Sequence, residues 1–320
     1  MAKKNILVII DRWYWALHRQ IIGLQPFISD YYDVKICTPD SLDKKTFDES
    51  DVIYLSFWKL PFWSRDLQKL CQIYANKIIA GIHSHYSIEQ EVNVLTRPDK
   101  DVAPSEAIQV YLSKFKALGT ISPRLFKLFK DVHENVYYLK AGVDEKLFTQ
   151  KNPVEVNRSK IRIGWAGSTL NHSGKRGFAN ILQPLQKSYS DIFDFNFCIE
   201  HINGRNFEEM DSFYNEIDLY ICVSRSEGAS TPIREALSCG RAILSTNVGD
   251  VPEIIKSNYN GWIIPEWTLE ATVENLLFLN SNRSLLKACA LNARKSILDS
   301  WTWEQVAPYW LTAFEAVIGK

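Results

Sequence analysis

Short apolar runs alternate with longer amphipathic segments along most of the chain, and this alternation constrains the fold more than any other feature. The first series opens with a strand predicted at Asn5–Ile10 and a helix at Tyr14–Ile28, and it closes with a strand at Asn135–Leu139. A second series runs from a strand at Ile161–Trp165 to one at Gly261–Ile264. Because strands that alternate with helices favour parallel, doubly wound sheets, we expect an α/β chain with two Rossmann-like sheets.

The two series are separated by a polar stretch at Thr149–Lys160, which contains Pro153 and has no hydrophobic periodicity. A chain of 320 residues is long enough for two domains of roughly 150 residues each. We therefore expect a first domain over residues 1–148 and a second over residues 149–302. Since ligands of open α/β sheets bind at the carboxyl ends of the strands, two such sheets facing across a cleft would hold two ligands against each other.

Composition excludes several classes of partner and cofactor. Lys plus Arg equals Asp plus Glu at 37 each, so no global basic field exists and we expect no nucleic-acid partner. The six cysteines include no CxxC pair, which favours buried thiols in a reducing cytoplasm. The first apolar run ends at Asp11, too early for a signal peptide, and no apolar run is long enough to span a membrane. Without a DxD motif or histidines at ligand spacing, we expect no metal and no other cofactor.

One strand–loop–helix segment has the composition of an anion-binding site. A strand predicted at Leu219–Val223 leads into a loop of small residues and then into a helix with Pro232 near its start. Thr231 is placed to cap this helix and Gly240 to end it. The unpaired N–H groups and the partial positive charge of a helix N-terminus attract phosphate. By these residues alone, a structural loop before a capped helix is an equally good interpretation.

Two carboxylates in this segment, Glu227 and Glu235, lie before the helix and inside its first turns, so they can reach different parts of an elongated ligand. The run S-R-S-E-G-A-S-T-P-I-R-E-A-L-S-C-G resembles the E-x7-E motif of family 4 glycosyltransferases. The sequence onward to Pro265 is similar to the Gly-rich turn, P-E-I-I helix start and N-G strand of that family. The resemblance implies the GT-B fold, a nucleotide-sugar donor, and a C-terminal helix over residues 303–320 that crosses back to the first domain.

The resemblance also implies a role for each matching residue. Glu235 would bind the ribose hydroxyls of the donor, where the alternative is a solvated helix residue. Glu227 would lie beside the donor sugar as a catalytic group. The sugar and the diphosphate would be held by the backbone of four consecutive residues: Gly228, Ala229, Ser230 and Thr231.

A basic pair is expected beside the diphosphate, because the departing nucleotide develops negative charge that fixed cations stabilise. The family has an Arg after a strand glycine and a Lys before another glycine. Here Gly167 ends the strand, Ser168 stands in the Arg position, and Lys175 and Arg176 precede Gly177. The resemblance thus implies a diphosphate site at Gly167, Ser168, Lys175 and Arg176, in which the two cations act jointly. The alternative is a solvated basic turn.

Two histidines follow the strand predicted at Lys77–Ile82 in the first domain. His83 stands where the family often has a histidine, and the resemblance implies a catalytic role at the donor sugar or the reacting centre. His85 is the second candidate, on the acceptor side. A histidine with a purely structural role is the alternative for both.

The first strand is followed by aromatic residues, whereas the family has a Gly-rich loop at this place. Arg12, Trp13 and Tyr14 follow that strand, and a second aromatic cluster spans Phe57–Trp63. We predict that Arg12, Trp13 and Tyr14, together with His85, bind the acceptor, on whose rings the aromatics would stack. Contact with a membrane interface and ordinary core packing are the alternatives.

The predicted function is retaining, hexosyltransferase-like transfer of a sugar from a nucleotide-sugar donor to a hydroxyl of a glycan, a lipid-linked or a small-molecule acceptor, as in polysaccharide biosynthesis. We expect it to be independent of metal and to take place in the cytoplasm, with peripheral contact at the inner membrane face as an alternative location. One alternative function is a nucleotide-sugar epimerase of the same architecture. Another is a non-catalytic module that binds sugar nucleotides, which the Ser168 departure favours and the intact pair Glu227 and Glu235 disfavours.

Overall fold

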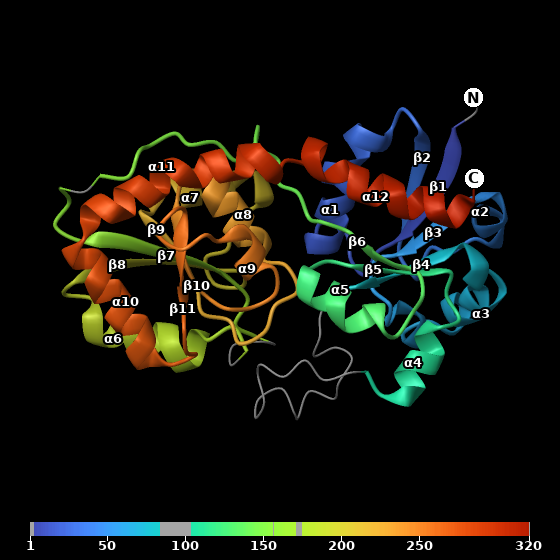
Figure 1. Ribbon diagram of the computed structural model, residues 1–320, viewed down its shortest axis with the longest axis horizontal. Helices are drawn as coiled ribbons and strands as arrows, with labels where there is room; N and C mark the ends of the chain where they lie inside the picture. Colours follow the sequence, from blue (N-terminus) through green and yellow to red (C-terminus); the bar gives the residue numbers. More distant parts are fainter. Residues whose placement is uncertain (1–2, 84–103, 156, 171–174, 320) are drawn as a thin grey trace. The chain divides into compact units, whose positions relative to one another are not determined.

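The computed structural model describes residues 3–83, 104–155, 157–170 and 175–319, and the chain forms two compact units (Figure 1). Unit 1 comprises Met1–Gly142 and Trp303–Lys320, and unit 2 comprises Val143–Thr302. The boundary precedes the polar stretch at residues 149–160 because Val143 pairs with Thr302 and Phe148 packs in the core of unit 2. The chain therefore passes from one unit to the other twice.

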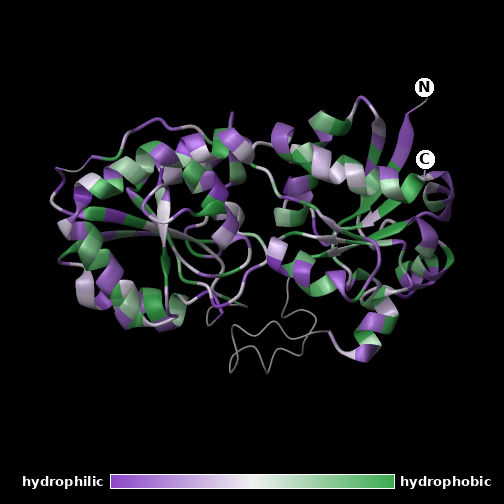
Figure 2. Cartoon of the chain, in the orientation of Figure 1, coloured by the Kyte–Doolittle hydropathy of each residue, from purple (hydrophilic) through white to green (hydrophobic). Residues whose placement is uncertain are grey.

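Unit 1 contains a parallel sheet of six strands in the order β2-β1-β3-β4-β5-β6. Strand β1 is buried on both faces of the sheet. Ile6 and Val8, which face one side, are as inaccessible to solvent as Leu7 and Ile9, which face the other. This accounts for the continuous apolar runs in the sequence. In Figure 2 strands in the middle of this sheet are green, while β1 begins purple beside the N-terminus. The strands are β1 (Lys4–Ile9), β2 (Tyr32–Cys37), β3 (Val52–Leu55), β4 (Ile78–Ile82), β5 (Ala117–Thr120) and β6 (Val136–Tyr138).

The last helix of the chain, α12 (Trp303–Ile318), packs against α1 (Ala16–Ile28) on one face of this sheet. The indole of Trp303 fits where two glycines leave room: an added Cβ would lie 2.1 Å from its Nε1 at Gly23 and 2.6 Å from its Cδ2 at Gly142. The prediction that the C-terminal helix returns to the first domain is confirmed. The other helical segments of unit 1 are α2 (Lys44–Glu49), η1 (Leu60–Phe62), α3 (Arg65–Ile73), η2 (Ala75–Lys77), α4 (Glu106–Leu112) and α5 (Pro123–Lys130).

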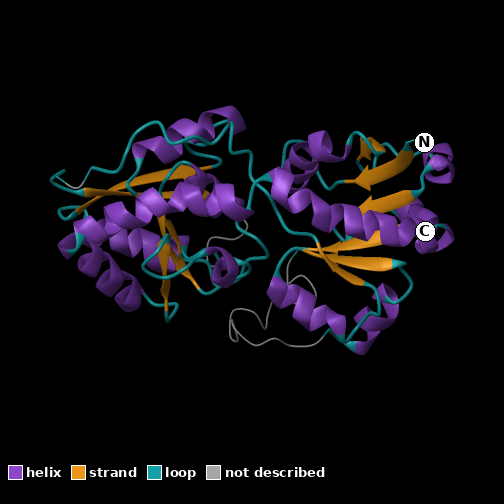
Figure 3. Ribbon diagram, turned by 45° about the horizontal axis from the view of Figure 1, so that its top comes forward, coloured by secondary structure: helices purple, strands orange, loops and turns teal. Residues whose placement is uncertain are grey.

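Unit 2 contains a parallel sheet of five strands in the order β11-β10-β9-β7-β8. Figure 3 draws the strands of both units in orange and the helices around them in purple. Both faces are covered, because Ile163 and Trp165 of β7 belong to one apolar cluster while Ala166 belongs to another. The strand order reverses at β7, so the loops after β7 and β9 flank the switch point where open α/β sheets bind ligands. The strands are β7 (Ile161–Gly167), β8 (Phe193–Ile199), β9 (Leu219–Cys222), β10 (Ala242–Thr246) and β11 (Gly261–Ile264).

The helical segments of unit 2 lie between and after these strands. They are η4 (Phe178–Leu182, a π-helical turn), α6 (Gln183–Tyr189), η5 (Phe207–Glu209), α7 (Met210–Glu216), α8 (Thr231–Ser238), α9 (Val251–Ile254), α10 (Leu269–Ser281) and α11 (Arg283–Ser300). The predicted fold class of two doubly wound parallel sheets is confirmed. All six cysteines are buried and free, also as predicted. Among the described residues, none of the helices combines the length and the apolar character that crossing a bilayer requires.

One local prediction in unit 1 is wrong, and one short helix was not predicted. The first helix does not begin at Tyr14, because Tyr14 has φ +66° in the left-handed region and α1 begins only at Ala16. The short helix α2 was not predicted at all, since six residues show no clear periodicity. Asp43 makes this helix possible, because its carboxylate accepts a hydrogen bond from the Lys45 N–H at 3.1 Å.

Candidate functional site

The loops that follow β7 and β9 meet at the carboxyl edge of the unit 2 sheet. Gly167 ends β7, and a Cβ added there would lie 3.3 Å from Nη1 of Arg176. The backbone N–H of Arg225, after β9, donates to the carbonyl of Lys175 at 2.7 Å. Three residues predicted from the sequence, Gly167, Lys175 and Arg176, therefore lie together, next to the loop that contains Glu227. The fourth, Ser168, directly follows Gly167 in the chain.

Gly177 allows this close approach. Its φ is +72°, and an added Cβ would lie 2.2 Å from the carbonyl oxygen of Val223, the residue that follows β9. A side chain at this position would therefore meet backbone rather than a flexible neighbour. The turn that contains the two predicted cations packs directly on the strand that leads into the carboxylate loop.

Glu227 is partly exposed and is held by its own loop. Ser224 Oγ donates a hydrogen bond to Glu227 Oε1 at 2.8 Å. The hydroxyl of Thr246, the last residue of β10, in turn donates to the carbonyl of Ser224 at 2.5 Å. The carboxylate is thus oriented from two neighbouring strands and is still accessible to a ligand.

The loop after β10 supports the backbone beside Glu227. Gly249 has φ +54°, and an added Cβ would lie 2.5 Å from the carbonyl oxygen of Gly228 and 2.9 Å from that of Glu227. The small residues at 228–230 are therefore backed by a second stretch of backbone. This contact requires glycine at position 249 for both its conformation and its size.

The N-terminus of α8 differs from the prediction. Thr231 does not cap the helix, because it already lies inside it, and the N-cap is Ser230, whose side chain makes no capping bond. Instead the Ser230 N–H donates to Asp250 Oδ1 at 3.3 Å. The other end is as predicted, since Gly240 has φ +69° just after the C-cap.

A buried ion pair connects α8 to the loop after β10. Arg234 and Asp250 are 1% and 2% exposed, and Arg234 Nη1 contacts Asp250 Oδ2. Within the described residues, Nε and Nη2 of Arg234 have no hydrogen-bond partner. Sequence reasoning missed this pair, because an Arg in an amphipathic helix is usually solvated and nothing in the sequence links it to position 250.

Glu235 is 4% exposed, so it is not the solvated helix residue of the alternative interpretation. Its Oε2 accepts a hydrogen bond from the hydroxyl of Tyr214 at 2.6 Å. Tyr214 lies on α7 and is fully buried, and burial raises the pKa of its phenol well above the ordinary value. The tyrosine is therefore a neutral donor that fixes the carboxylate, a role that the sequence did not reveal.

His83 directly follows β4 in unit 1, and its Nε2 lies 2.9 Å from the hydroxyl of Tyr54. Burial lowers the pKa of His83 to about 4, so the ring is neutral at physiological pH. Tyr54 is 1% exposed and was not among the predicted residues. His85, the second candidate, lies outside the described residues.

The aromatic loop after β1 is exposed. Trp13, Tyr14 and Trp15 are 43%, 78% and 42% accessible, so core packing is wrong for these residues. The Arg12 guanidinium lies 4.2 Å from the ring centroid of Trp15, and the Tyr14 N–H donates to Nδ1 of His18 at 3.0 Å. These contacts give the loop a definite shape with its rings displayed outward.

The second aromatic cluster is divided between core and surface. Trp58 is buried, whereas Phe62 and Trp63 are 57% and 62% exposed. The rings of Phe57 and Trp63 lie 5.8 Å apart, and Phe62 lies 5.0 Å from Tyr111 of α4. The core-packing interpretation is therefore right for Trp58 and wrong for Phe62 and Trp63.

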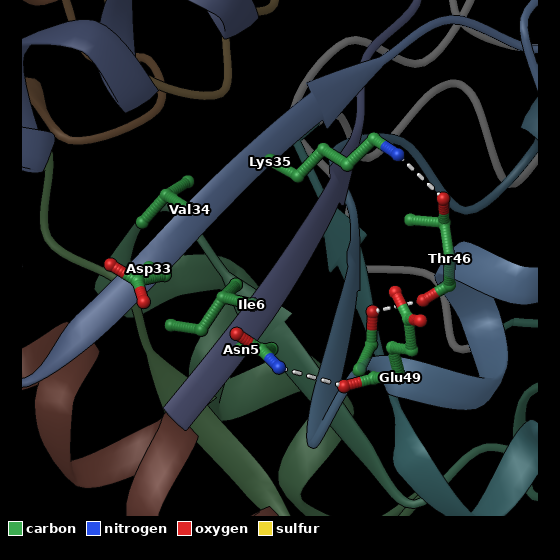
Figure 4. A pocket seen from close by; sticks show the side chains of 8 residues that line it. Asn5, Ile6, Asp33, Val34, Lys35, Thr46 and Glu49 are labelled. Carbon is green, nitrogen blue, oxygen red and sulfur yellow. Dashed lines mark hydrogen bonds between the residues drawn. The ribbon is translucent and has the colours of Figure 1, made fainter. Parts of the chain in front are cut away.

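One pocket of unit 1 lies away from these residues, beside the first halves of β1 and β2 (Figure 4). Across it Lys35 Nζ donates to Thr46 Oγ1 at 2.6 Å, and the Asn5 amide donates to the carbonyl of Glu49 at 3.0 Å. No predicted site residue lines it. The lining residues are Asn5, Ile6, Asp33, Val34, Lys35, Thr46, Glu49 and Ser50.

Comparison with known sequences gives a family match that lies within unit 2. Residues 198–296 match the family model described as glycosyl transferases group 1. The uncharacterized glycosyltransferase MJ1178 of Methanocaldococcus jannaschii is 29% identical over 107 residues, which is 33% of this chain and 30% of that protein. The amylovoran biosynthesis glycosyltransferase AmsK of Erwinia amylovora is 24% identical over 127 residues, or 38% and 31% of the two chains. The match thus spans about a third of the length of these relatives.

Solved structures resemble the whole chain. Anabaena Alr3699/HepE in complex with UDP and glucose has a TM-score of 0.72 at 12% identity, over 96% of this chain and 98% of that one. The sucrose-phosphate synthase tll1590 of Thermosynechococcus elongatus has a TM-score of 0.70 at 12% identity, over 97% and 98%. At this identity the likeness establishes the fold, which is GT-B.

Proposed function

We propose that this chain, a member of the group 1 glycosyltransferases with the GT-B fold, transfers a sugar from a nucleotide-sugar donor to a hydroxyl acceptor with retention of configuration. The observation that best supports this is the carboxylate pair of the segment 224–240. Glu227 is partly exposed and held by Ser224, while Glu235 is buried and fixed by Tyr214. Both lie within the part of the chain that matches the family model.

The donor would lie along this segment. Glu235 would accept hydrogen bonds from the ribose hydroxyls, and because Tyr214 already orients its carboxylate, little ordering is needed on binding. The backbone of residues 228–231 and the N-terminus of α8 would face the sugar and the diphosphate. Glu227 would lie beside the hydroxyls of the transferred sugar.

The charge that develops on the leaving diphosphate would be stabilised by Lys175 and Arg176. Arg176 lies beside the end of β7, where Nη1 of Arg176 would be 3.3 Å from a Cβ added at Gly167, and the carbonyl of Lys175 accepts a hydrogen bond from the Arg225 N–H after β9. Fixed cations that already stand where charge develops lower the barrier without reorganising during the reaction. In this proposal the leaving phosphate assists same-face attack by the acceptor, and we expect turnover to be unchanged by EDTA.

The acceptor would bind unit 1, with His83 at the reacting centre and Arg12, Trp13 and Tyr14 in contact with an acceptor ring. Exposed tryptophan and tyrosine rings offer broad faces for sugar rings at little entropic cost. The amylovoran role in the name of AmsK favours a growing polysaccharide as the acceptor. The ligands in the HepE complexes make UDP-glucose the first donor to test.

Calorimetry with UDP-glucose, followed by turnover assays, tests the donor site. In Glu235→Gln the carboxylate charge is lost while the shape is kept, and we expect the donor KM to rise roughly tenfold to a hundredfold, as for a lost charge-assisted hydrogen bond. Glu274→Gln, at an exposed position of α10, is the matched control and should change nothing. Unchanged donor binding and turnover in Glu235→Gln would contradict the site.

Two other functions make different predictions in the same assays. An epimerase would convert the nucleotide-sugar with no acceptor present, so product analysis of a donor-only reaction separates it from a transferase. A non-catalytic module would bind the donor in calorimetry and show neither transfer nor hydrolysis. The proposal expects transfer that depends on an added acceptor.

A further inference from the structure

The hydroxyl of Tyr54 reaches from the interior of unit 1 to the predicted catalytic histidine. Tyr54 lies within β3, and its ring makes an edge contact with Trp310 of α12 at 5.4 Å between centroids. Its hydroxyl lies 2.9 Å from Nε2 of His83. Complete burial raises the pKa of the phenol far above its ordinary range, so the hydroxyl keeps its proton.

The Tyr54 hydroxyl can reach His83 because β4 has a glycine two residues before His83. A Cβ added at Gly81 would lie 2.9 Å from the Tyr54 hydroxyl oxygen and 2.7 Å from the carbonyl oxygens of Leu55 and Ser56. Any side chain at position 81 would therefore displace the hydroxyl or the end of β3. The absence of a side chain at Gly81 therefore leaves room for the contact between Tyr54 and His83.

The direction of the hydrogen bond between Tyr54 and His83 follows from the partners that the Tyr54 hydroxyl has. Within the described residues, His83 is the one hydrogen-bond partner of the Tyr54 hydroxyl. If His83 Nε2–H donated to Tyr54, the tyrosine O–H would be buried without an acceptor, which native structures avoid. The O–H therefore donates to Nε2, and a neutral imidazole that accepts at Nε2 has its proton on Nδ1.

We propose that Tyr54 is a positioning residue that holds His83 in the Nδ1–H tautomer, so that the ring offers its ligand a hydrogen-bond donor. His83 then acts by donating to a substrate oxygen and does not act as a general base. The identity of that oxygen rests on the proposed function, in which His83 lies at the donor sugar or the reacting centre. The tautomer itself does not depend on any substrate.

The tautomer is measured directly by long-range ¹H–¹⁵N NMR of the full chain labelled with ¹⁵N-histidine at neutral pH. The signals of His83 are assigned by their loss in His83→Asn. We expect a protonated Nδ1 and an unprotonated, hydrogen-bonded Nε2. In Tyr54→Phe, which keeps the ring and its contact with Trp310, we expect the proton to move to Nε2.

Tyr32→Phe is the matched control, because Tyr32 is also a buried tyrosine of this sheet and packs on Phe314 of the same helix. It should leave the His83 spectrum unchanged. A wild-type spectrum with the proton on Nε2, or a Tyr54→Phe spectrum identical to wild type, would overturn the proposal whatever the activity of the chain.

Kinetics then separate this proposal from the proposed function. We expect kcat to fall roughly tenfold in Tyr54→Phe with little change in donor KM, as for one misplaced hydrogen bond. We also expect His83→Asn, whose amide nitrogen can replace Nδ1, to keep more activity than His83→Gln, whose nitrogen replaces Nε2. If the spectra show the expected tautomer and all three variants turn over like wild type, the positioning by Tyr54 stands and the catalytic role of His83 fails.

Discussion

The carboxyl edges of the two sheets are built by different means. In unit 2, loops touch through backbone at Gly177 and Gly249, and charged side chains such as Arg234 are buried beneath them. In unit 1, the loops after β1 and β3 display aromatic rings such as Trp13 and Trp63 to solvent. A site made of backbone and buried charge is fixed in shape, whereas a site made of exposed side chains is easily changed. We infer that the edge of unit 2, where we propose that the donor binds, is constrained by folding, and that the edge of unit 1, where we propose that the acceptor binds, is free to vary.

The largest expected effect is at the buried ion pair of unit 2. Arg234→Ala leaves the Asp250 carboxylate buried without its partner, which should lower the free energy of unfolding by about 3–5 kcal/mol. Urea denaturation measures this. Because removal of both charges leaves neither unpaired, the double variant Arg234→Ala/Asp250→Ala should be less destabilised than the sum of the single variants. A loss below about 1 kcal/mol in Arg234→Ala would mean that this edge is not constrained as we infer.

The next effect is on the pH dependence of the free energy of unfolding. It tests whether unit 1 also contains a side chain, His83, that the fold constrains. The pKa of His83 is lowered to about 4 in the folded chain from 6.5, so between these values the unfolded chain binds more protons. The free energy of unfolding should therefore fall as the pH is lowered through this window, by roughly 3 kcal/mol in total from this residue. His83→Gln should remove that part of the pH dependence, whereas His201→Gln, at an exposed position, should not. Equal slopes in all three chains would contradict the lowered pKa of His83.

A smaller effect, on ligand binding, distinguishes the strain of a left-handed backbone from the steric clash of an added Cβ. Gly249→Ala adds a methyl group 2.5 Å from a carbonyl oxygen at φ +54°, while Gly319→Ala has φ +79° and nothing within 4 Å. Both substitutions incur the left-handed strain of about 1–2 kcal/mol, but only the first displaces the loop beside Glu227. We expect the Kd for UDP to rise roughly tenfold in Gly249→Ala alone, as measured by calorimetry. The same Kd in both variants would show that the contact is irrelevant to binding.

The smallest effects on stability are expected at the exposed rings of unit 1. Trp13→Ala and Trp63→Ala should each change the free energy of unfolding by less than about 0.5 kcal/mol, because surface changes rarely exceed this. The donor KM should be unchanged while the acceptor KM rises. If either variant instead unfolds the chain or weakens UDP binding, the contrast between the two edges is lost.

The sequence predicts best what is encoded locally. Alternating runs define both sheets, and the segment with Glu227, Pro232 and Gly240 is recognisable because strand, loop, helix start and helix end follow one another without interruption. The contacts of Tyr214 with Glu235 and of Tyr54 with His83 join residues more than 20 positions apart, from different elements. No periodicity or spacing encodes such contacts, because they arise only when the elements pack.

Surface and backbone details are also poorly encoded. The rings at Trp13 and Trp58 look alike in the sequence, yet one is exposed and the other buried, since each depends on how its loop leaves the sheet. The left-handed backbone at Tyr14 was equally hidden, because a tyrosine with positive φ goes against the usual preference of bulky residues.

The return of α12 to unit 1 has a consequence for synthesis on the ribosome. Trp310 and Phe314 belong to the core that covers β1 and β3, yet they are translated after all 160 residues of unit 2. At about 5–20 residues per second, this face of unit 1 waits roughly ten to thirty seconds for its last helix. Unit 2 is continuous in sequence and is complete before unit 1 is. The nascent chain therefore exposes an apolar sheet during that interval, when a chaperone can bind it.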